Sequence, residues 1–282
     1  MYRDLIQKIF EREYIDLWGV LPEEECVMQK PEIFHRTASF SLKSSIIFAI
    51  PYYGGRPKNF SAYAAAKDYH FYISEVAKRI CNSLRRAIPE GSFAAFADHS
   101  PIDERLAAVK SGIGIFGENG LVLTEKYSSF IFLGDILTDI PANLLGWEKT
   151  FPIASCEGCG ACKKACPTGI LRGEGEDCLS AITQKKGELT ASEQELMRKC
   201  NTAWGCDICQ EACPWTHRAL EKGTIYSQIP YFCEDRIEEL TSAAVGEMGE
   251  EEFRLRAFAW RGRKTVLRNT LILESEGKKR DV

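Results

Sequence analysis

The cysteines carry the clearest chemical signal in the chain, which has twelve of them. One run has the form Cys-x2-Cys-x2-Cys-x3-Cys-Pro and occupies residues 156–167. Two-residue gaps let a short loop bring three thiolates to one iron–sulfur cube, while the fourth cysteine of such a run binds the second cube of a pair. A shorter run, Cys-x2-Cys-x3-Cys-Pro, occupies residues 206–214. The two runs together predict two [4Fe–4S] clusters.

In two-cluster ferredoxins the last cysteine of a run binds the cube that the other run holds, and this rule assigns most of the cluster ligands. The first cube takes Cys156, Cys159, Cys162 and Cys213. The second cube takes Cys166, Cys206 and Cys209, and it needs one more ligand. Cys178 and Cys200 are both candidates, and spacing alone does not choose between them. Zinc fits this pattern poorly, because zinc sites usually pair two Cys-x2-Cys knuckles or combine cysteine with histidine.

Two further stretches have motif-like spacing. Asp98-His99-Ser100-Pro101 stands where an expected strand ends and a helix begins, a common position for catalytic side chains. Asp98 or Ser100 could equally serve only as a helix cap. The stretch 112–117 reads Gly-x-Gly-x-x-Gly, but it follows a helical segment and precedes a strand, the reverse of a dinucleotide-binding turn. We interpret it as a loop.

Hydrophobic periodicity places these motifs on an α+β framework. We expect helices over 1–18, 60–88 and 100–110, strands over 45–52 and 93–97, and a hairpin or strand pair over 120–138 that turns at 125–127. The expected organisation is an N-terminal α+β domain over residues 1–150, a two-cluster domain over 151–220, and a short helical tail over 221–282.

Composition suggests a cytoplasmic protein without a membrane anchor. Charged residues make up 27% of the 282-residue chain, and the longest strongly apolar run, 46–53, is too short to span a bilayer. The N-terminus lacks a signal-peptide pattern. The net charge of −4 does not indicate a general affinity for nucleic acid, but residues 254–268 carry six basic side chains and no acid. This strip is either a solvated helix face or a phosphate-contacting surface.

Several of these motifs, in this order, resemble the epoxyqueuosine reductase family. The likeness covers roughly residues 40–270. It is carried by Tyr63-Ala64, Asp68-Tyr69-His70, Asp98-His99-Ser100-Pro101-x-x-Glu104-Arg105, the loop 111–119, the stretch 130–139, Cys166-Pro167-Thr168-Gly169, Cys178-Leu179-Ser180, the stretch 205–215 and Leu267-Arg268-Asn269. The chain resembles a short form of the family, without its C-terminal helical-repeat domain.

The resemblance implies a cobalamin-dependent iron–sulfur reductase, related to reductive dehalogenases, that converts epoxyqueuosine to queuosine at the tRNA wobble position. It implies that Asp98 is the proton donor and that Cys178 is the missing cluster ligand. It also implies an α/β corrinoid-binding domain, with Ser61, Asp98, Val122 and Leu133 beside the corrinoid, joined to a bacterial-ferredoxin-like domain. The anticodon stem-loop of tRNA is then the expected partner, and a flavodoxin or ferredoxin the expected electron donor.

The implied chemistry sets requirements on the residues. Converting an epoxide to an alkene takes two electrons and two protons, so low-potential clusters and a carboxylic acid are suitable tools. Asp98 would need a raised pKa, which desolvation in a covered pocket supplies. His70 is interpreted as a half-buried helix residue, because the chain shows no complete cobalt-ligand motif around it. The alternatives are a corrinoid iron–sulfur reductase of a small molecule and a ferredoxin-type electron carrier.

Overall fold

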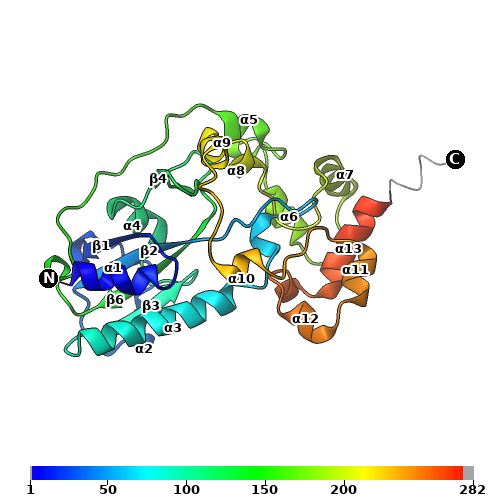
Figure 1. Ribbon diagram of the computed structural model, residues 1–282. Helices are drawn as coiled ribbons and strands as arrows, with labels where there is room; N and C mark the ends of the chain where they lie inside the picture. Colours follow the sequence, from blue (N-terminus) through cyan, green and yellow to red (C-terminus); the bar gives the residue numbers. More distant parts are fainter. Residues whose placement is uncertain (1, 276–282) are drawn as a thin grey trace.

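The computed structural model describes residues 2–275 and contains a four-stranded antiparallel sheet at its N-terminal end (Figure 1). The strands are β1 (Leu17–Pro22), β2 (Ser44–Pro51), β6 (Ile131–Thr138) and β3 (Phe93–Ala97), in that spatial order. β2 is buried along its whole length, as its β-branched and aromatic sequence favours. The expected strands over 45–52 and 93–97 are therefore confirmed.

Side chains alternate across β2 and so divide the core into two layers. Ile46 and Phe48 pack with α1 (Arg3–Glu11) and α3 (Tyr69–Ala87) on one face. Ile47 and Ala49 pack on the other face with α2 (Pro31–Thr37) and α4 (Glu104–Lys110). The sheet is thereby covered on both faces, and mixed helix and sheet is the architecture that the sequence predicts.

Two expected element boundaries at the N-terminal end were wrong. The helix expected over 1–18 ends at Glu11, because the chain turns there and enters β1, where Trp18 pairs with Phe48. The helix expected from residue 60 begins at Tyr69 instead. Asp68 caps it with a side-chain oxygen 3.0 Å from the backbone nitrogen of His70.

The expected start of the helix over 100–110 was also wrong, and the strand pair expected over 120–138 is limited to its turn, where Thr124 and Ser128 pair through two backbone hydrogen bonds. α4 begins at Glu104, and Asp103 is its cap, so neither Asp98 nor Ser100 has the capping role. β5 (Val122–Leu123) pairs with β4 (Ile115–Phe116), whereas β6 joins the large sheet between β2 and β3. The Gly-x-Gly-x-x-Gly stretch lies between α4 and β5, as interpreted from the sequence, and contains the short strand β4.

The rest of the chain is helical and irregular. The helices after the sheet are α5 (Ala161–Ala165), α6 (Leu179–Thr183), α7 (Ala191–Cys200), α8 (Ile208–Glu211), α9 (Pro214–Glu221), α10 (Pro230–Cys233), α11 (Ser242–Glu247), α12 (Glu250–Arg254) and α13 (Arg263–Glu274). Short 3-10 helices occupy Glu23–Glu25, Ala62–Ala64, Ala142–Leu144, Ile170–Arg172 and Ala259–Arg261.

The C-terminal helices pack against both earlier parts of the chain. Phe232 of α10 lies in the core layer that contains α3. Trp204, which precedes the second cysteine run, packs with Phe258 and with Ala64 and Ala65. On α13, the Asn269 side chain donates to the carbonyl oxygens of Thr183 and Ala203 at 2.7 and 2.8 Å. These contacts hold the sheet, the cysteine-rich part and the tail together, and the domain boundaries at 150 and 220 stay a prediction. None of the helices within residues 2–275 has the length and apolar character needed to cross a membrane.

Candidate functional site

The four cysteines assigned to the first cube line one cavity. The cavity is also lined by Leu123 of β5 and Trp215 of α9, and its cysteines are Cys156, Cys159, Cys162 and Cys213. Gly158 and Gly160 have φ values of +69° and +73° in the loop that carries the first three cysteines. Because a side chain there would be strained, glycine at both positions lets the loop curl around the cavity.

Cys166, Cys178, Cys206 and Cys209 form a second group beside the first. The Cys178 thiolate raises the pKa of both Cys206 and Cys209, after the larger effect of burial, so it lies near both of them. Cys166 also acts on Cys209. Cys200, in contrast, has its pKa raised by burial and otherwise responds only to Lys199. This placement favours Cys178 over Cys200 as the eighth ligand, which stays a prediction.

The donor set fits a cube better than a single metal ion. In residues 2–275, no three His, Cys, Asp or Glu side chains lie close enough together to bind one ion. A zinc ion requires four ligands at about 2.0–2.3 Å, whereas a cube spreads its ligands over four separate irons. Four thiolates around one cavity, drawn from two runs that each end in Cys-Pro, are the donor set of an iron–sulfur cube.

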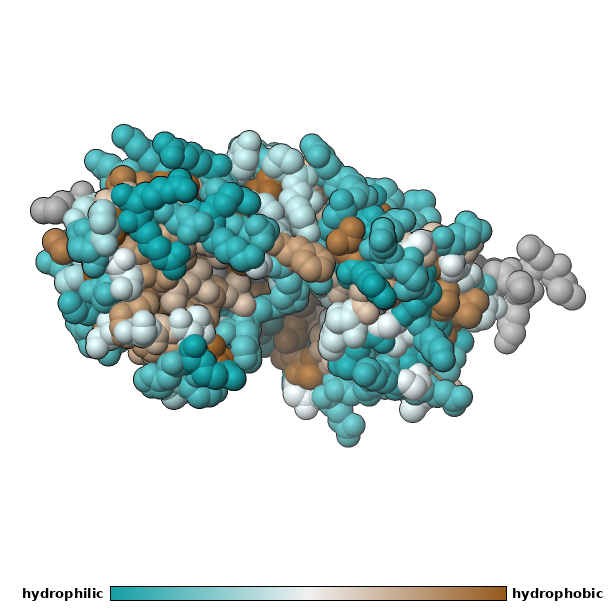
Figure 2. All heavy atoms as spheres, turned by 90° about the horizontal axis from the view of Figure 1, so that it is seen from below, coloured by the Kyte–Doolittle hydropathy of each residue, from teal (hydrophilic) through white to brown (hydrophobic). Residues whose placement is uncertain are grey.

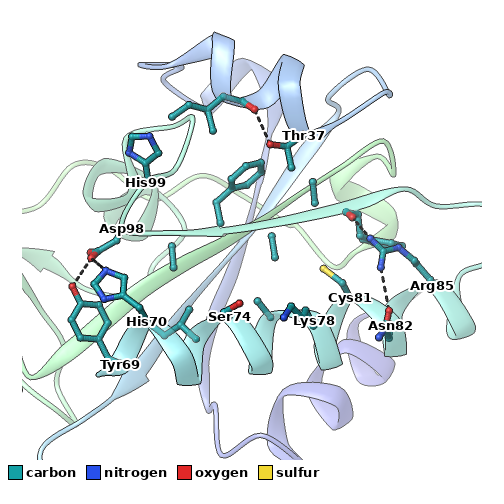
Figure 3. A pocket seen from close by; sticks show the side chains of 18 residues that line it. Thr37, Tyr69, His70, Ser74, Lys78, Cys81, Asn82, Arg85, Asp98 and His99 are labelled. Carbon is teal, nitrogen blue, oxygen red and sulfur yellow. Dashed lines mark hydrogen bonds and ion pairs between the residues drawn. The ribbon is translucent and has the colours of Figure 1, made fainter. Parts of the chain in front are cut away.

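Asp98 lies at the mouth of a separate pocket between α3 and β3 (Figure 3). The pocket has a volume of about 710 Å³, and most of its wall is apolar, with Ile73, Ala77 and Phe93 among the lining residues. Asp98 follows the last residue of β3 and has a φ of +61°, in the left-handed region that non-glycine residues rarely adopt. The half-exposed carboxylate is thus held at the edge of the sheet in an uncommon backbone conformation.

Two side chains from the first turn of α3 contact the Asp98 carboxylate (Figure 3). The Tyr69 hydroxyl donates to Oδ2 of Asp98, and Nε2 of His70 lies 3.0 Å from the same oxygen. Nδ1 of His70 lies 2.7 Å from Oδ1 of Asp68. His70 therefore bridges two carboxylates.

This bridging sets the protonation states at the pocket mouth. Hydrogen bonds to Asp68 and Asp98 raise the pKa of His70 to about 10, so the imidazole is a cation at neutral pH. The hydrogen bond from His70, followed by that from Tyr69, lowers the pKa of Asp98 despite its partial burial. In the uncovered pocket the imidazolium outweighs desolvation, and the raised pKa expected for Asp98 under a bound corrinoid stays a prediction. These pKa shifts favour a proton on His70 and a negative charge on Asp98 at neutral pH.

His70 is the site residue that sequence reasoning missed. It was interpreted as a half-buried helix residue, but it is exposed and contacts Asp98. The available signal was its place two residues after Asp68, a good helix cap, because the imidazole then stands in the first turn of α3 beside the capping carboxylate.

The other residues expected beside a corrinoid do not line the Asp98 pocket. Ser61 is buried, with Oγ 2.6 Å from Oδ1 of the equally buried Asp207. Val122 is buried in β5 next to Leu123, which borders the first cysteine cavity. Leu133 is half-buried near the start of β6. Their contact with a corrinoid stays a prediction.

The sheet is incompletely covered at the end that carries Asp98. The first three residues of β6 and the last three of β3 are only partly buried, although the rest of each strand is buried. Phe132 of β6 stacks on Tyr69 with ring centroids 4.1 Å apart. Figure 2 shows a hollow with an apolar floor between the two halves of the molecule. An apolar strand end beside Asp98 and His70 fits a large, largely flat group such as a corrinoid resting there.

The basic strip over 254–268 is only partly available for contacts with other molecules. Arg256 is buried, with ion pairs to Asp235 and Glu252, and Arg263 pairs with Glu250. Arg268 donates to the carbonyl oxygens of Lys185 and Gly187. The other three basic residues of the strip are Arg254, Arg261 and Lys264, of which Arg254 and Lys264 are exposed and Arg261 lies over the Trp260 ring.

Comparison with known proteins agrees with both parts of this arrangement. Residues 155–216 match the 4Fe-4S double cluster binding domain family. The epoxyqueuosine reductase of Listeria monocytogenes is 30% identical over 232 residues, which cover 78% of this chain and 58% of the relative. That of Cyclobacterium marinum is 36% identical over 157 residues, which cover 54% and 49%. The chain thus spans about half the length of the curated relatives that it matches.

Solved structures share the whole fold. The epoxyqueuosine reductase of Streptococcus thermophilus superposes with a TM-score of 0.78 at 22% identity, over 98% of this chain and 81% of that one. The Bacillus subtilis enzyme gives a TM-score of 0.75 at 21% identity, over 98% and 82%. The chain is therefore an iron–sulfur protein with a double-cluster domain joined to an α+β sheet domain. It is related to the epoxyqueuosine reductases, and the resemblance seen in its motifs is confirmed.

Proposed function

We propose that this chain reduces epoxyqueuosine to queuosine at the wobble position of tRNA, using two [4Fe–4S] clusters and cobalamin. The proposal is supported by the shared name of its relatives, and one structure with the same fold is described as an epoxyqueuosine reductase with an epoxyqueuosine-modified tRNA-Tyr stem loop. The observation that carries it is the Asp98–His70 pair, which stands beside an apolar, half-covered sheet end.

The reaction takes two electrons and two protons, removes the epoxide oxygen as water and leaves a carbon–carbon double bond. The clusters supply electrons one at a time at low potential, and a bound corrinoid supplies the two-electron reductant at the epoxide. The chain itself must supply the proton to the departing oxygen, which is a poor leaving group without one.

In this proposal the proton comes from the hydrogen-bonded unit of Asp98, His70 and Tyr69. The imidazolium of His70 holds it at neutral pH, and Asp98 lines the pocket 3.0 Å from Nε2 of the imidazole. A corrinoid that covers this end of the sheet would exclude water and remove Asp98 from solvent. Desolvation would then raise the pKa of the carboxyl group and favour transfer of the proton from Nε2 of His70 to Oδ2 of Asp98.

The corrinoid would be held by the half-covered strand ends, with Leu133 of β6 beneath it. Ser61 and Val122 would approach it from the side of the clusters. One Bacillus subtilis structure with this fold is described with its catalytic aspartate loop swung out of the active site. The turn that carries Asp98 is the corresponding candidate here, since it lies outside regular secondary structure.

The anticodon stem-loop is the proposed partner in this reaction, and a flavodoxin or ferredoxin is the proposed electron donor. The proposed location is the cytoplasm. Enzymes that act on one base of a folded RNA take that base out of its stack. Arg254, Arg261 and Lys264 are available for phosphate contacts near the C-terminal helices. A small-molecule substrate is the second candidate, because the other three basic residues of the strip are used within the fold.

The decisive experiment uses the full chain, reconstituted anaerobically with iron, sulfide and cobalamin. It is supplied with a chemical reductant and either tRNA that carries epoxyqueuosine or the free epoxyqueuosine nucleoside. The nucleosides are then separated by chromatography and identified by their masses in a mass spectrometer. Loss of one oxygen from the tRNA-borne base is the expected result. Reduction of the free nucleoside with the tRNA left untouched would favour the small-molecule reading, and no reduction of either would end the proposal.

A further inference from the structure

The second cysteine run carries two polar residues beside its ligands, and both are buried. Asp207 stands between Cys206 and Cys209, and Gln210 follows Cys209. Neither residue is among the predicted cluster ligands. A buried carboxylate is costly unless donors meet its oxygens, so the partners of Asp207 indicate what it does.

Three donors meet the Asp207 carboxylate. The Ser61 hydroxyl donates to Oδ1 at 2.6 Å, and the Gln210 side-chain amide donates to the same oxygen at 3.0 Å. The backbone N–H of Ala62 donates to Oδ2 at 2.7 Å. Two of the three donors belong to the segment 61–62, which precedes α3. Asp207 therefore links the second cysteine run to a part of the chain that lies far earlier in the sequence.

The backbones of these two segments also lie in close contact. The Ser61 N–H donates to the Trp204 carbonyl oxygen at 2.8 Å. Gly205, which precedes the first cysteine of the run, has a φ of +67°, and a Cβ atom there would lie 2.5 Å from Cβ of Ser61. Because only glycine fits such a position, the run begins directly against Ser61.

Gln210 connects the same run to the segment before β6. The Ser129 hydroxyl donates to Oε1 of Gln210 at 2.9 Å, and the Thr216 hydroxyl donates to the Gln210 carbonyl oxygen at 2.7 Å. Oγ of Ser128 lies 2.8 Å from Oγ1 of Thr216. All of these polar side chains are buried. The loop that holds the second cube is thus hydrogen-bonded at two places, to segments 61–62 and 128–129.

We propose that Asp207 is a positioning residue for the second cube: its buried carboxylate fixes the loop of Cys206 and Cys209 against segment 61–62 and keeps water away from that side of the cube. The proposal rests on the two clusters and not on the reaction with tRNA. Loss of the carboxylate leaves three buried donors without an acceptor, and water must enter to satisfy them. The loop then moves away from the segment before α3.

Hydrogen–deuterium exchange measures the contact itself. The full chain, loaded with both clusters and kept anaerobic, is exchanged and its peptides are analysed by mass spectrometry. The peptide that contains Ala62 should exchange about tenfold faster in Asp207→Ala, because its N–H loses a buried acceptor. Glu211→Ala is the matched control, since it removes a carboxylate of the same run that pairs with the exposed Arg56. This control should leave the exchange of the Ala62 peptide unchanged.

The reduction potentials of the two cubes measure the effect on the cluster. They are obtained from an anaerobic redox titration followed by electron paramagnetic resonance. A reduced cube carries more negative charge, which water stabilises, so Asp207→Ala should raise the potential of the second cube. Asp207→Asn keeps an oxygen acceptor and the volume of the side chain, so its shift should be smaller. Both variants should retain about eight irons per chain, because no ligand is changed.

Unchanged exchange of the Ala62 peptide in Asp207→Ala would overturn the proposal. So would equal potential shifts in the Ala and Asn variants, since these would indicate a lost charge rather than a lost acceptor. Equally fast exchange in Glu211→Ala would also overturn it, because the whole run would then be loosened.

A second variant keeps the test decisive if Asp207→Ala does not fold or load its clusters. Ser61→Ala removes one donor to Asp207 from outside the cysteine run, and it should show both changes to a smaller extent. Exchange and potential that both match the wild type in Ser61→Ala would contradict the proposal. Both changes in a chain without reductase activity would remove the proposed function and leave the positioning intact.

Discussion

Nε2 of His70 lies 3.0 Å from Oδ2 of Asp98, so the acid expected to donate a proton is hydrogen-bonded to an imidazolium. The two side chains have different roles: His70 carries the proton at neutral pH, and Asp98 lines the pocket. Tyr69 donates to the same carboxylate oxygen and stacks on Phe132, which fixes the pair against β6.

Replacement of His70 tests this division of roles. His70→Gln removes the proton store, and the pKa of Asp98 should rise toward its ordinary value. We expect turnover to fall about 10²-fold, the lower range for loss of acid–base assistance. The wild-type rate should decline as the pH rises through about 10, where His70 loses its proton, and this decline should be absent from the variant. An alkaline limb that persists in His70→Gln would assign it to another group.

The same pKa shift makes the fold sensitive to alkali. The folded-state pKa of His70 lies above its unfolded value of about 6.5. Its contribution to stability is therefore complete below pH about 6.5 and is lost as the pH rises to about 10. Thermal unfolding of the wild type and of His70→Gln should diverge at neutral pH and converge at high pH. A constant difference across this range would contradict the linkage.

Iron counting tests the ligand of the second cube. Cys178→Ala should lose iron or convert one cube to a three-iron form, because Cys178 lies beside Cys206 and Cys209. Cys200→Ala should keep about eight irons per chain, as two [4Fe–4S] clusters require. Iron and sulfide analysis, with electron paramagnetic resonance of the oxidised forms, distinguishes the two variants. The reverse pattern would make Cys200 the ligand.

Asn269 should stabilise the docking of the tail. Its buried amide bonds the Thr183 and Ala203 carbonyl oxygens, so Asn269→Ala leaves both without a donor. We expect a loss of about 1–3 kcal/mol in the free energy of unfolding, the usual effect of an unsatisfied buried polar group. Chemical denaturation measures this loss, and Lys264→Ala on the exposed face of the same helix should change little. Equal effects of the two variants would contradict this role.

Salt dependence separates RNA-binding residues from structural ones in the basic strip. Simultaneous replacement of Arg254, Arg261 and Lys264 by alanine should weaken tRNA binding. It should also reduce the slope of log K against log[salt] by roughly 2, if each residue contacts one phosphate. Arg256→Ala should instead lower the melting temperature, because Arg256 is buried and paired with Asp235 and Glu252. An unchanged slope in the triple variant would place the tRNA elsewhere.

Sequence reasoning worked best where local spacing decides the outcome. The cysteine runs predicted the double-cluster domain because cluster loops are short and continuous. β2 and β3 were found because their apolar runs are bounded by turn residues. The strand pair expected over 120–138 is present only at its turn, between Thr124 and Ser128, because the partners of β6 are β2 and β3, far away along the chain. Helical spacing from Leu5 to Phe10 concealed the start of β1, since Trp18 packs on the same core layer.

The chemistry of Asp98 could not be predicted from its own motif. Its protonation depends on His70, which lies 28 residues earlier and approaches only because α3 runs along β3. Long-range pairing of charged groups is set by topology, and topology is what single-sequence patterns specify least.

The most direct measurement is single-turnover reduction of epoxyqueuosine-containing tRNA by wild type and Asp98→Asn. Both proteins are first matched for cluster content, bound cobalamin and tRNA affinity. The wild type should form queuosine, and Asp98→Asn should form it about 10²–10⁴-fold more slowly, the range for loss of a general acid. Equal rates in the two proteins would remove Asp98 from the reaction, and absence of queuosine from both would contradict the proposed activity.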